Sequence, residues 1–155
     1  MKPLAGWRGM TVLDEPRMDN PNNLIIGMHL FFEKELDEKY RQSIDDKLKN
    51  YQGPIIIMDD AFTMEYLRRY VKQMNPGGER YFIKTKPCSN ALLSMKFDDF
   101  VSFLRCFSNY IPISLMGGYY NRESNRITGC LGSLDSELIK FGFETELVQG
   151  CVFQQ

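Results

Sequence analysis

The sequence predicts an α/β fold in which a mixed β-sheet of about five to seven strands packs with three to four helices. Three observations lead to this prediction. Segments with apolar residues at every second position alternate along the chain with segments of helical apolar spacing. Hydrophobic residues make up 43% of the 155 residues, which is enough to bury a core. The segment from Pro54 to Met58 is apolar on both faces, as is typical of a central strand covered by helices on both sides.

The first half of the chain contains five predicted elements. They are a short strand at 10–13, a strand at 24–32, a helix at 33–50, a strand at 54–58 and a helix that ends near Asn75. Proline and asparagine residues predict a loop between the first two strands. The helix at 33–50 has one narrow apolar stripe and otherwise charged residues, so we expect a surface helix with one buried edge.

The second half continues the alternation. Its predicted elements are a strand at 80–86, a helix at 97–110, a strand at 111–116, a segment at 126–131 that pairs back as a hairpin, a helix at 134–141 and a strand at 143–153. Ser133 is the expected N-cap of the last helix, and Gly142 is expected to end it. Because no linker interrupts this pattern, we expect one domain over residues 1–155, with a largely irregular N-terminal segment at 1–23.

Composition excludes several classes of protein. The formal net charge of −1 argues against a globally basic nucleic-acid protein. No run of 18 apolar residues and no apolar signal-peptide region is found, so we expect a cytoplasmic protein that does not contact a membrane. The chain has four widely spaced cysteines and one histidine, which predicts reduced thiols, no structural zinc site and no cofactor.

Asp59 and Asp60 are the clearest candidates for catalysis. They follow the predicted central strand, at the carboxyl end where open α/β sheets place their ligands. Adjacent carboxylates there can hold Mg²⁺ for phosphoryl transfer or hydrolysis. The simpler interpretation is that one of them caps the helix that follows.

His29 is the only histidine, and so the only conventional general base near neutral pH. The simpler interpretation is a structural histidine on a half-covered sheet face. A nucleophilic Cys–His pair with Cys88, Cys106, Cys130 or Cys151 stays open, because such pairs meet only in space.

Cations and aromatic residues alternate along the strand at 80–86. Phe82 shares a face with Arg80, Lys84 and Lys86, an arrangement that can stack a base and hold phosphates. The preceding helix adds further cations, namely Arg68, Arg69 and Lys72. The same residues suit an acidic protein surface. The simpler interpretation is an edge strand that its lysines protect from pairing with other chains.

The loop after the predicted strand at 111–116 carries Tyr119, Tyr120 and Arg122. Tyrosine and arginine dominate the hot spots of protein interfaces, so these residues are candidates for partner binding. Tyrosines beside a hairpin can equally be packed against the sheet.

The charges are unevenly distributed along the chain. Residues 61–126 hold 10 basic and 5 acidic side chains, whereas the flanking segments are both acidic. The sequence therefore favours a non-enzymatic protein-binding module, such as an inhibitor or a toxin-neutralising immunity protein, that docks on a partner with an acidic surface. Two alternatives stay open: a metal-dependent hydrolase or nuclease that uses Asp59 and Asp60, and a nucleic-acid binder that uses the strand at 80–86.

Overall fold

The computed structural model describes residues 11–12, 22–31, 38–85, 97–107, 112–123 and 125–154. The strands of its main sheet are β1 (Thr11–Val12), β2 (Ile25–Met28), β3 (Ile55–Asp60), β4 (Arg80–Thr85), β5 (Ile113–Gly118) and β8 (Thr145–Phe153). The hairpin strands are β6 (Asn121–Glu123) and β7 (Arg126–Thr128). The helices are α1 (Glu38–Asn50), α2 (Ala61–Met74), α3 (Phe97–Leu104) and α4 (Cys130–Lys140).

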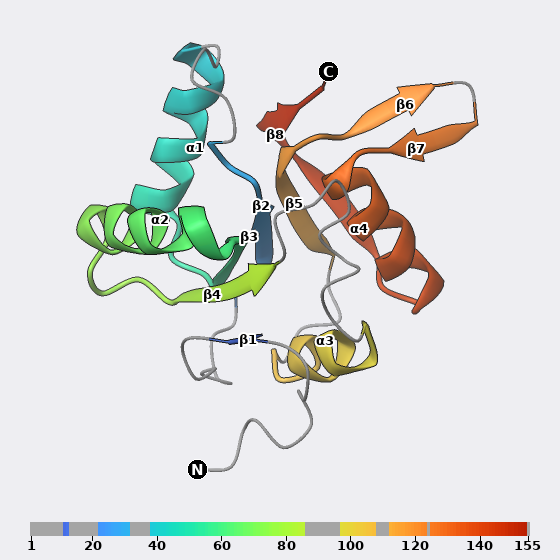
Figure 1. Ribbon diagram of the computed structural model, residues 1–155, viewed down its shortest axis with the longest axis horizontal. Helices are drawn as coiled ribbons and strands as arrows, with labels where there is room; N and C mark the ends of the chain where they lie inside the picture. Colours follow the sequence, from blue (N-terminus) through green and yellow to red (C-terminus); the bar gives the residue numbers. More distant parts are fainter. Residues whose placement is uncertain are drawn as a thin grey trace.

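The main sheet has the strand order β1-β4-β3-β2-β5-β8. The five strands from β4 to β8 are parallel, and only β1 runs antiparallel, on β4. From β2 the chain moves outward through β3 and β4, and then returns to the other side of β2 to form β5 and β8 (Figure 1). This is the order of a doubly wound sheet, and the order reverses between β2 and β5.

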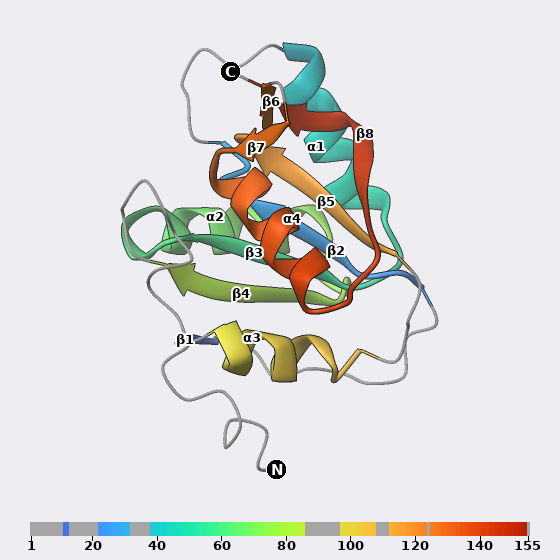
Figure 2. The same cartoon turned by 90° about the vertical axis from the view of Figure 1, so that its right-hand side faces the viewer.

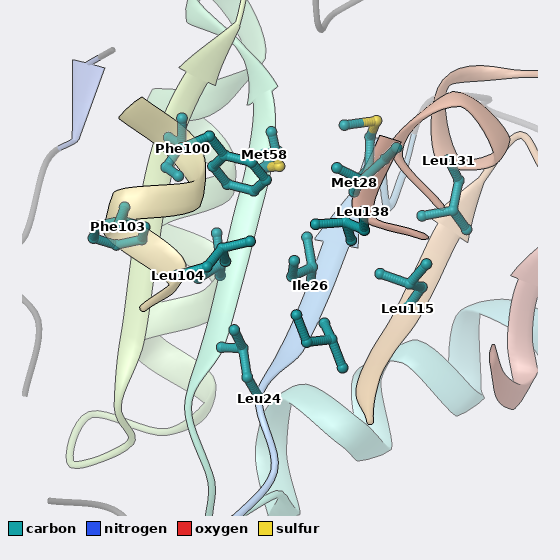
Figure 3. Packing of buried hydrophobic residues seen from close by; sticks show 14 of the residues in the cluster. Leu24, Ile26, Met28, Met58, Phe100, Phe103, Leu104, Leu115, Leu131 and Leu138 are labelled. Atoms are coloured by element: carbon teal, nitrogen blue, oxygen red, sulfur yellow. The ribbon is translucent and has the colours of Figure 1, made fainter. Parts of the chain in front are cut away.

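Two helices cover each face of the sheet (Figures 1 and 2). Because side chains alternate along a strand, Ile55 and Ile57 of β3 enter the core under α1 and α2, while Ile56 and Met58 enter the core under α3 and α4. Figure 3 shows the second of these cores, where aromatic residues of α3 and leucines of α4 lie over the central strands. Both faces are therefore buried, which explains the continuous apolar run in β3.

The α/β class and the mixed sheet predicted from the sequence are confirmed, with six strands in the main sheet and four helices among the described residues. The short strand near Thr11 is also confirmed. Much of the predicted irregular segment at 1–23 and the predicted helix start at 33–37 lie outside the described residues. No helix in the described part of the chain is both long and apolar enough to cross a membrane.

The strand predicted at 24–32 is shorter than expected. It ends at Met28, because His29 has a backbone φ of +47°, which an extended strand cannot contain. The helix predicted at 97–110 ends at Leu104 as an α-helix, and residues 108–110 lie outside the described part. The strand at 80–86 does not lie at an edge, because β4 pairs with β3 on one side and with β1 on the other.

The region between β5 and α4 also differs from the prediction. The segment at 126–131 forms a hairpin, as predicted, but it does not pair with β5, which corresponds to the strand predicted at 111–116. Instead, β7 pairs with β6 in a separate hairpin that projects from the main sheet (Figure 1). The last helix begins at Cys130 with Gly129 as its N-cap, four residues before the predicted start, while the predicted end at Gly142 is confirmed by its φ of +88°.

Candidate active site

A hydrogen-bonded pair of side chains lies at the carboxyl edge of the sheet. The Nδ1 atom of His29 lies 2.9 Å from Oδ1 of Asp59, and both side chains are largely shielded from solvent, with 16% and 5% exposed. The same Asp59 oxygen accepts the backbone N–H of Asp60 at 2.8 Å. The carboxylate is therefore held in place and oriented toward the imidazole.

The register of two parallel strands brings this pair together. Residues of β2 pair with residues thirty positions later in β3, from Ile25 with Ile55 to Met28 with Met58. The next position in this register sets His29 beside Asp59. The His29 N–H continues the ladder by donating to the carbonyl of Met58 at 3.1 Å. The pair is thus built by backbone pairing of β2 with β3.

Cys130 completes a group of three side chains. The thiol of Cys130 lies near enough to the imidazole of His29 to raise its pKa, as Asp59 does. Cys130 is the first residue of α4, where the helix dipole stabilises negative charge. Cysteine, histidine and aspartate are the residue types that serve as nucleophile, base and orienting group in cysteine-dependent enzymes.

The electrostatics of the three groups favour a charged imidazole. Burial lowers the pKa of His29, but the hydrogen bonds and charges of Asp59 and Cys130 outweigh it and raise the pKa from 6.5 to about 10. His29 is therefore an imidazolium at neutral pH. A positive charge stabilises a neighbouring thiolate, which is the reactive form of cysteine in general.

Glycines allow the backbone to close tightly around the group. Gly117, at the end of β5, has a φ of +108°, and a Cβ there would lie 2.0 Å from the carbonyl oxygen of Met28. Gly129 has a φ of +92°, and a Cβ there would lie 2.2 Å from the carbonyl oxygen of Tyr119. That same carbonyl accepts the N–H groups of the second and third residues of α4, at 3.1 and 3.2 Å. Both glycines are needed to bring α4 and its Cys130 to the edge of β2.

The position in the sheet matches where ligands bind in this architecture. The strand order reverses between β2 and β5, and His29 lies at the carboxyl end of β2. In doubly wound sheets, ligands bind outside the carboxyl ends of the strands at the point where the order reverses. In Figure 2 the arrowheads of β4 and β5 mark this edge on the left-hand side. The β6–β7 hairpin connects the end of β5 to Gly129 and Cys130 at the same edge.

The two predicted catalytic acids have separate roles. Asp59 faces His29, whereas Asp60 caps α2 by accepting the N–H of Thr63 at 2.8 Å, as the simpler interpretation expected. Among the described residues, no group of three or more His, Cys, Asp or Glu side chains is arranged to hold a metal ion. The two carboxylates are therefore used in different contacts.

Arg80 and Phe82 are not available to a partner at the surface. Arg80 is only 5% exposed, and its guanidinium donates to backbone carbonyls of Leu48, Tyr51, Gly53 and Glu79. Phe82 is fully buried under α2, with the charged groups of Arg68 and Lys72 over its ring at 5.9 and 5.8 Å. This corrects their assignment to a binding surface, because the face that they share belongs to the core.

The other predicted partner-binding residues are dispersed over the molecule. Tyr120 is 5% exposed and donates to buried Asp135 at 2.8 Å, which corrects its assignment to the surface. Tyr119 is half-buried against Phe153. Of the remaining cations, Arg69, Lys72 and Arg122 are exposed and Arg68 and Lys84 are half-buried, while Lys86 lies outside the described residues. The predicted protein-binding and nucleic-acid-binding roles stay predictions.

Two cavities in the described part of the chain lie away from the three side chains. They have volumes of about 410 and 470 Å³ and share Lys47, Tyr51 and Gln149 as lining residues. The larger one is lined by the starts of β2, β5 and β8, at the amino edge of the sheet. Neither contains a group of catalytic side chains.

Cys130 is the candidate site residue that sequence reasoning did not single out from the four cysteines. Its start-of-helix position was hidden because the predicted helix began after Ser133. The Gly-Cys dipeptide after a hairpin was the available signal, since a glycine can cap a helix whose first residue is then exposed to the dipole. Comparisons of the chain with known protein families, with curated proteins and with solved structures find no match.

Proposed function

We propose that the protein is a cysteine-dependent hydrolase or acyl transferase in which Cys130 is the nucleophile. The hydrogen bond of His29 to Asp59 and its proximity to Cys130, at the carboxyl edge of a doubly wound sheet, carry the proposal. The substrate class is a carbonyl compound with a good leaving group, such as a thioester, an ester or an activated amide.

In the first step the Cys130 thiolate attacks the carbonyl carbon of the substrate. A carbon–sulfur bond forms, and the carbonyl electrons move to oxygen in a tetrahedral intermediate. When the intermediate collapses, the bond to the leaving group breaks, and the His29 imidazolium donates its proton to that group. The product of this step is an acyl-Cys130 thioester and a neutral His29.

In the second step His29 acts as a base. It takes a proton from water or from an acceptor alcohol, thiol or amine, which attacks the thioester. The acyl group leaves Cys130, and the thiolate and the imidazolium are restored together. Asp59 stabilises the positive charge on His29 and holds Nδ1, so that Nε2 points to the reacting atoms.

Thiol reactivity tests the proposal without knowledge of the natural substrate. The experiment uses Cys88→Ser as the parent protein, because Cys88 lies outside the described residues. Iodoacetamide at about pH 6 should alkylate Cys130 at least about tenfold faster than Cys106 and Cys151, because burial raises the pKa of both other thiols. Peptide mass spectrometry gives the three rates from one digest.

The second measurement uses His29→Gln, which keeps a polar side chain but cannot carry the positive charge. It should slow alkylation of Cys130 by about tenfold or more and leave the other two rates unchanged. Hydrolysis of p-nitrophenyl acetate should be lost in Cys130→Ser. The proposal fails if Cys130 reacts no faster than Cys106, or if His29→Gln, still folded by circular dichroism, reacts at the parent rate.

A further inference from the structure

A polar groove runs between α1 and β8 from the amino edge of the sheet. The cavities of about 410 and 470 Å³ both contact Lys47, Tyr51 and Gln149, so they adjoin, and we call them together the amino-edge groove. Its two walls are packed against each other, since Tyr40 of α1 meets Phe153 of β8 with ring centroids 5.6 Å apart. Each cavity has the volume of a site that binds a small molecule.

Tyr51 is held in place at the centre of this groove. Its hydroxyl donates to the backbone carbonyl of Asn23, and the Lys47 ammonium lies over its ring at 5.8 Å. Burial raises the pKa of Tyr51, the charge of Arg80 lowers it, and the charge of Glu146 raises it. Lys47 and Glu146 therefore both lie near Tyr51, and both line the larger cavity.

Lys47 and Glu146 carry opposite charges, yet in the described ranges they form no ion pair with each other. The Lys47 ammonium lies over the Tyr51 ring, and Oε1 of Glu146 accepts the hydroxyl of Ser114 at 2.9 Å. An ammonium has three donors and a carboxylate can accept several hydrogen bonds, so both groups keep capacity for a ligand. A molecule that satisfies both carries an anionic group for Lys47 and a cationic group for Glu146.

The rest of the lining indicates a small ligand with a polar and an apolar part. Asn22, Asn23 and Gln149 bring amide groups to the groove, which can both donate and accept hydrogen bonds. Ile25 and Val148 line the larger cavity with apolar surface. Polar backbone atoms of a ligand suit the amides, and an apolar side chain suits the two aliphatic residues.

The charges of the groove disfavour an anion such as phosphate. Asp46 also lines the smaller cavity, where its Oδ1 accepts the amide of Gln42 at 2.9 Å. With Glu146, the lining then holds two carboxylates and one ammonium, that of Lys47. A multiply charged anion would be repelled by both acids, whereas a ligand with one charge of each sign would not.

From these observations we infer that the amino-edge groove binds a free α-amino acid, whose carboxylate contacts Lys47 and whose ammonium contacts Glu146. An α-amino acid carries both charges in one small molecule and adds a side chain for the apolar lining. The groove lies away from Cys130, so this inference does not rest on the proposed cysteine chemistry.

The test screens the whole chain against each of the standard L-amino acids at about 5 mM by thermal unfolding, because a ligand of the folded state raises Tm. At least one amino acid should raise Tm and, in an NMR titration, shift the backbone amide signals of residues 43–51 and 146–151. Its N-acetyl derivative lacks the positive charge and its amide lacks the carboxylate. Both derivatives should bind about tenfold or more weakly than the parent amino acid.

Two variants assign the binding to the groove. Lys47→Met and Glu146→Gln should each raise the Kd by about tenfold or more, because each removes one charged contact. The matched controls are Lys49→Met and Glu144→Gln, which change exposed residues outside the lining and should keep the parent Kd. Circular dichroism checks that the four variants are folded, and the ligand derivatives test the same two contacts without any substitution.

The inference is wrong if no amino acid raises Tm, if the two derivatives bind as tightly as the amino acid, or if the groove variants and the controls lose affinity equally. Inorganic phosphate or glucose that shifts the groove signals where no amino acid does so would assign the site to an anion or a sugar and would also overturn it. Cys130→Ala should bind the amino acid with the parent Kd. A loss of binding in that variant would place the ligand at the carboxyl edge instead of in the groove.

Discussion

Replacing Asp59 by asparagine tests the electrostatics of the proposed active site most directly. The substitution removes the negative charge from the carboxylate that lies 2.9 Å from Nδ1 of His29, but keeps the size and shape of the side chain. Burial, which disfavours the charged imidazole, is left unchanged. We therefore expect the pKa of His29 to fall strongly from its value of about 10.

The magnitude follows from the pKa values. The difference between 6.5 and about 10 corresponds to on the order of 5 kcal/mol in favour of the imidazolium. Asp59 and Cys130 supply this together, against the cost of burial. Asp59→Asn should remove the larger share, and Cys130→Ser a smaller one, because Asp59 is the stronger of the two causes that raise the pKa.

Proton NMR can measure the effect without assignment, because His29 is the only histidine in the chain. The imidazole C–H resonances of the wild type should titrate near pH 10, and those of Asp59→Asn should titrate at a much lower pH. A wild-type midpoint at or below 6.5 would refute the reasoning, because His29 would then be neutral at physiological pH. Equal midpoints in the wild type and in Asp59→Asn would refute the assigned cause.

The same shift makes the stability depend on pH. The pKa of His29 is about 10 in the folded protein and 6.5 in a free side chain, so the unfolded chain loses this proton first as the pH rises. The stabilisation from the imidazolium is fully present below pH 6.5 and is lost as the pH rises through 10. The free energy of unfolding, measured with urea, should therefore fall over this pH range by more in the wild type than in His29→Gln.

Three further substitutions, with Gly142→Ala as a control for the first, test the packing of the fold by urea unfolding. Gly129→Ala should lower the unfolding free energy by about 3 kcal/mol or more, because its Cβ would lie 2.2 Å from a carbonyl oxygen. Gly142→Ala has a similar positive φ but nothing within 4 Å of the added Cβ, so it should lower the unfolding free energy by only about 1 kcal/mol. Equal losses in the two variants would contradict the close approach at Gly129. Arg80→Leu should cost about 3 kcal/mol, because four backbone carbonyls lose their donor, and a change within about 0.5 kcal/mol would show that the guanidinium is not built into the fold. Tyr120→Phe should cost about 1 to 2 kcal/mol by removing a donor from buried Asp135, whereas a neutral effect would return this tyrosine to the candidates for partner binding.

Some residues of the candidate site could be predicted from the sequence, and others could not. Asp59 was identified because it follows an apolar run that predicts a central strand, and the end of such a strand is a common ligand site. His29 was placed in a strand, although its positive φ ends β2 one residue earlier. Apolar alternation continues past that point, and periodicity alone does not reveal a single residue with an unusual backbone angle.

The partner of His29 depended on register. Nothing in the local sequence says that β2 and β3 pair with an offset of thirty residues, yet that offset alone sets His29 beside Asp59. The position of Cys130 depended on two glycines and a hairpin that turn α4 toward the edge of β2. The function that the geometry supports therefore differs from the non-enzymatic role that the sequence favoured.

By itself, the sequence determined the α/β class and most of the elements, because the period of apolar residues reports directly which side of a strand or helix is buried. It also showed a cationic middle segment between acidic flanks. Only the tertiary structure decided where the side chains lie: Arg80 and Phe82 are in the interior, Phe62 is exposed, and His29 is hydrogen-bonded to Asp59 and lies near Cys130. The physical reason is that strand order, strand register and the path of a loop are settled by packing between distant segments, which no local pattern of residues encodes.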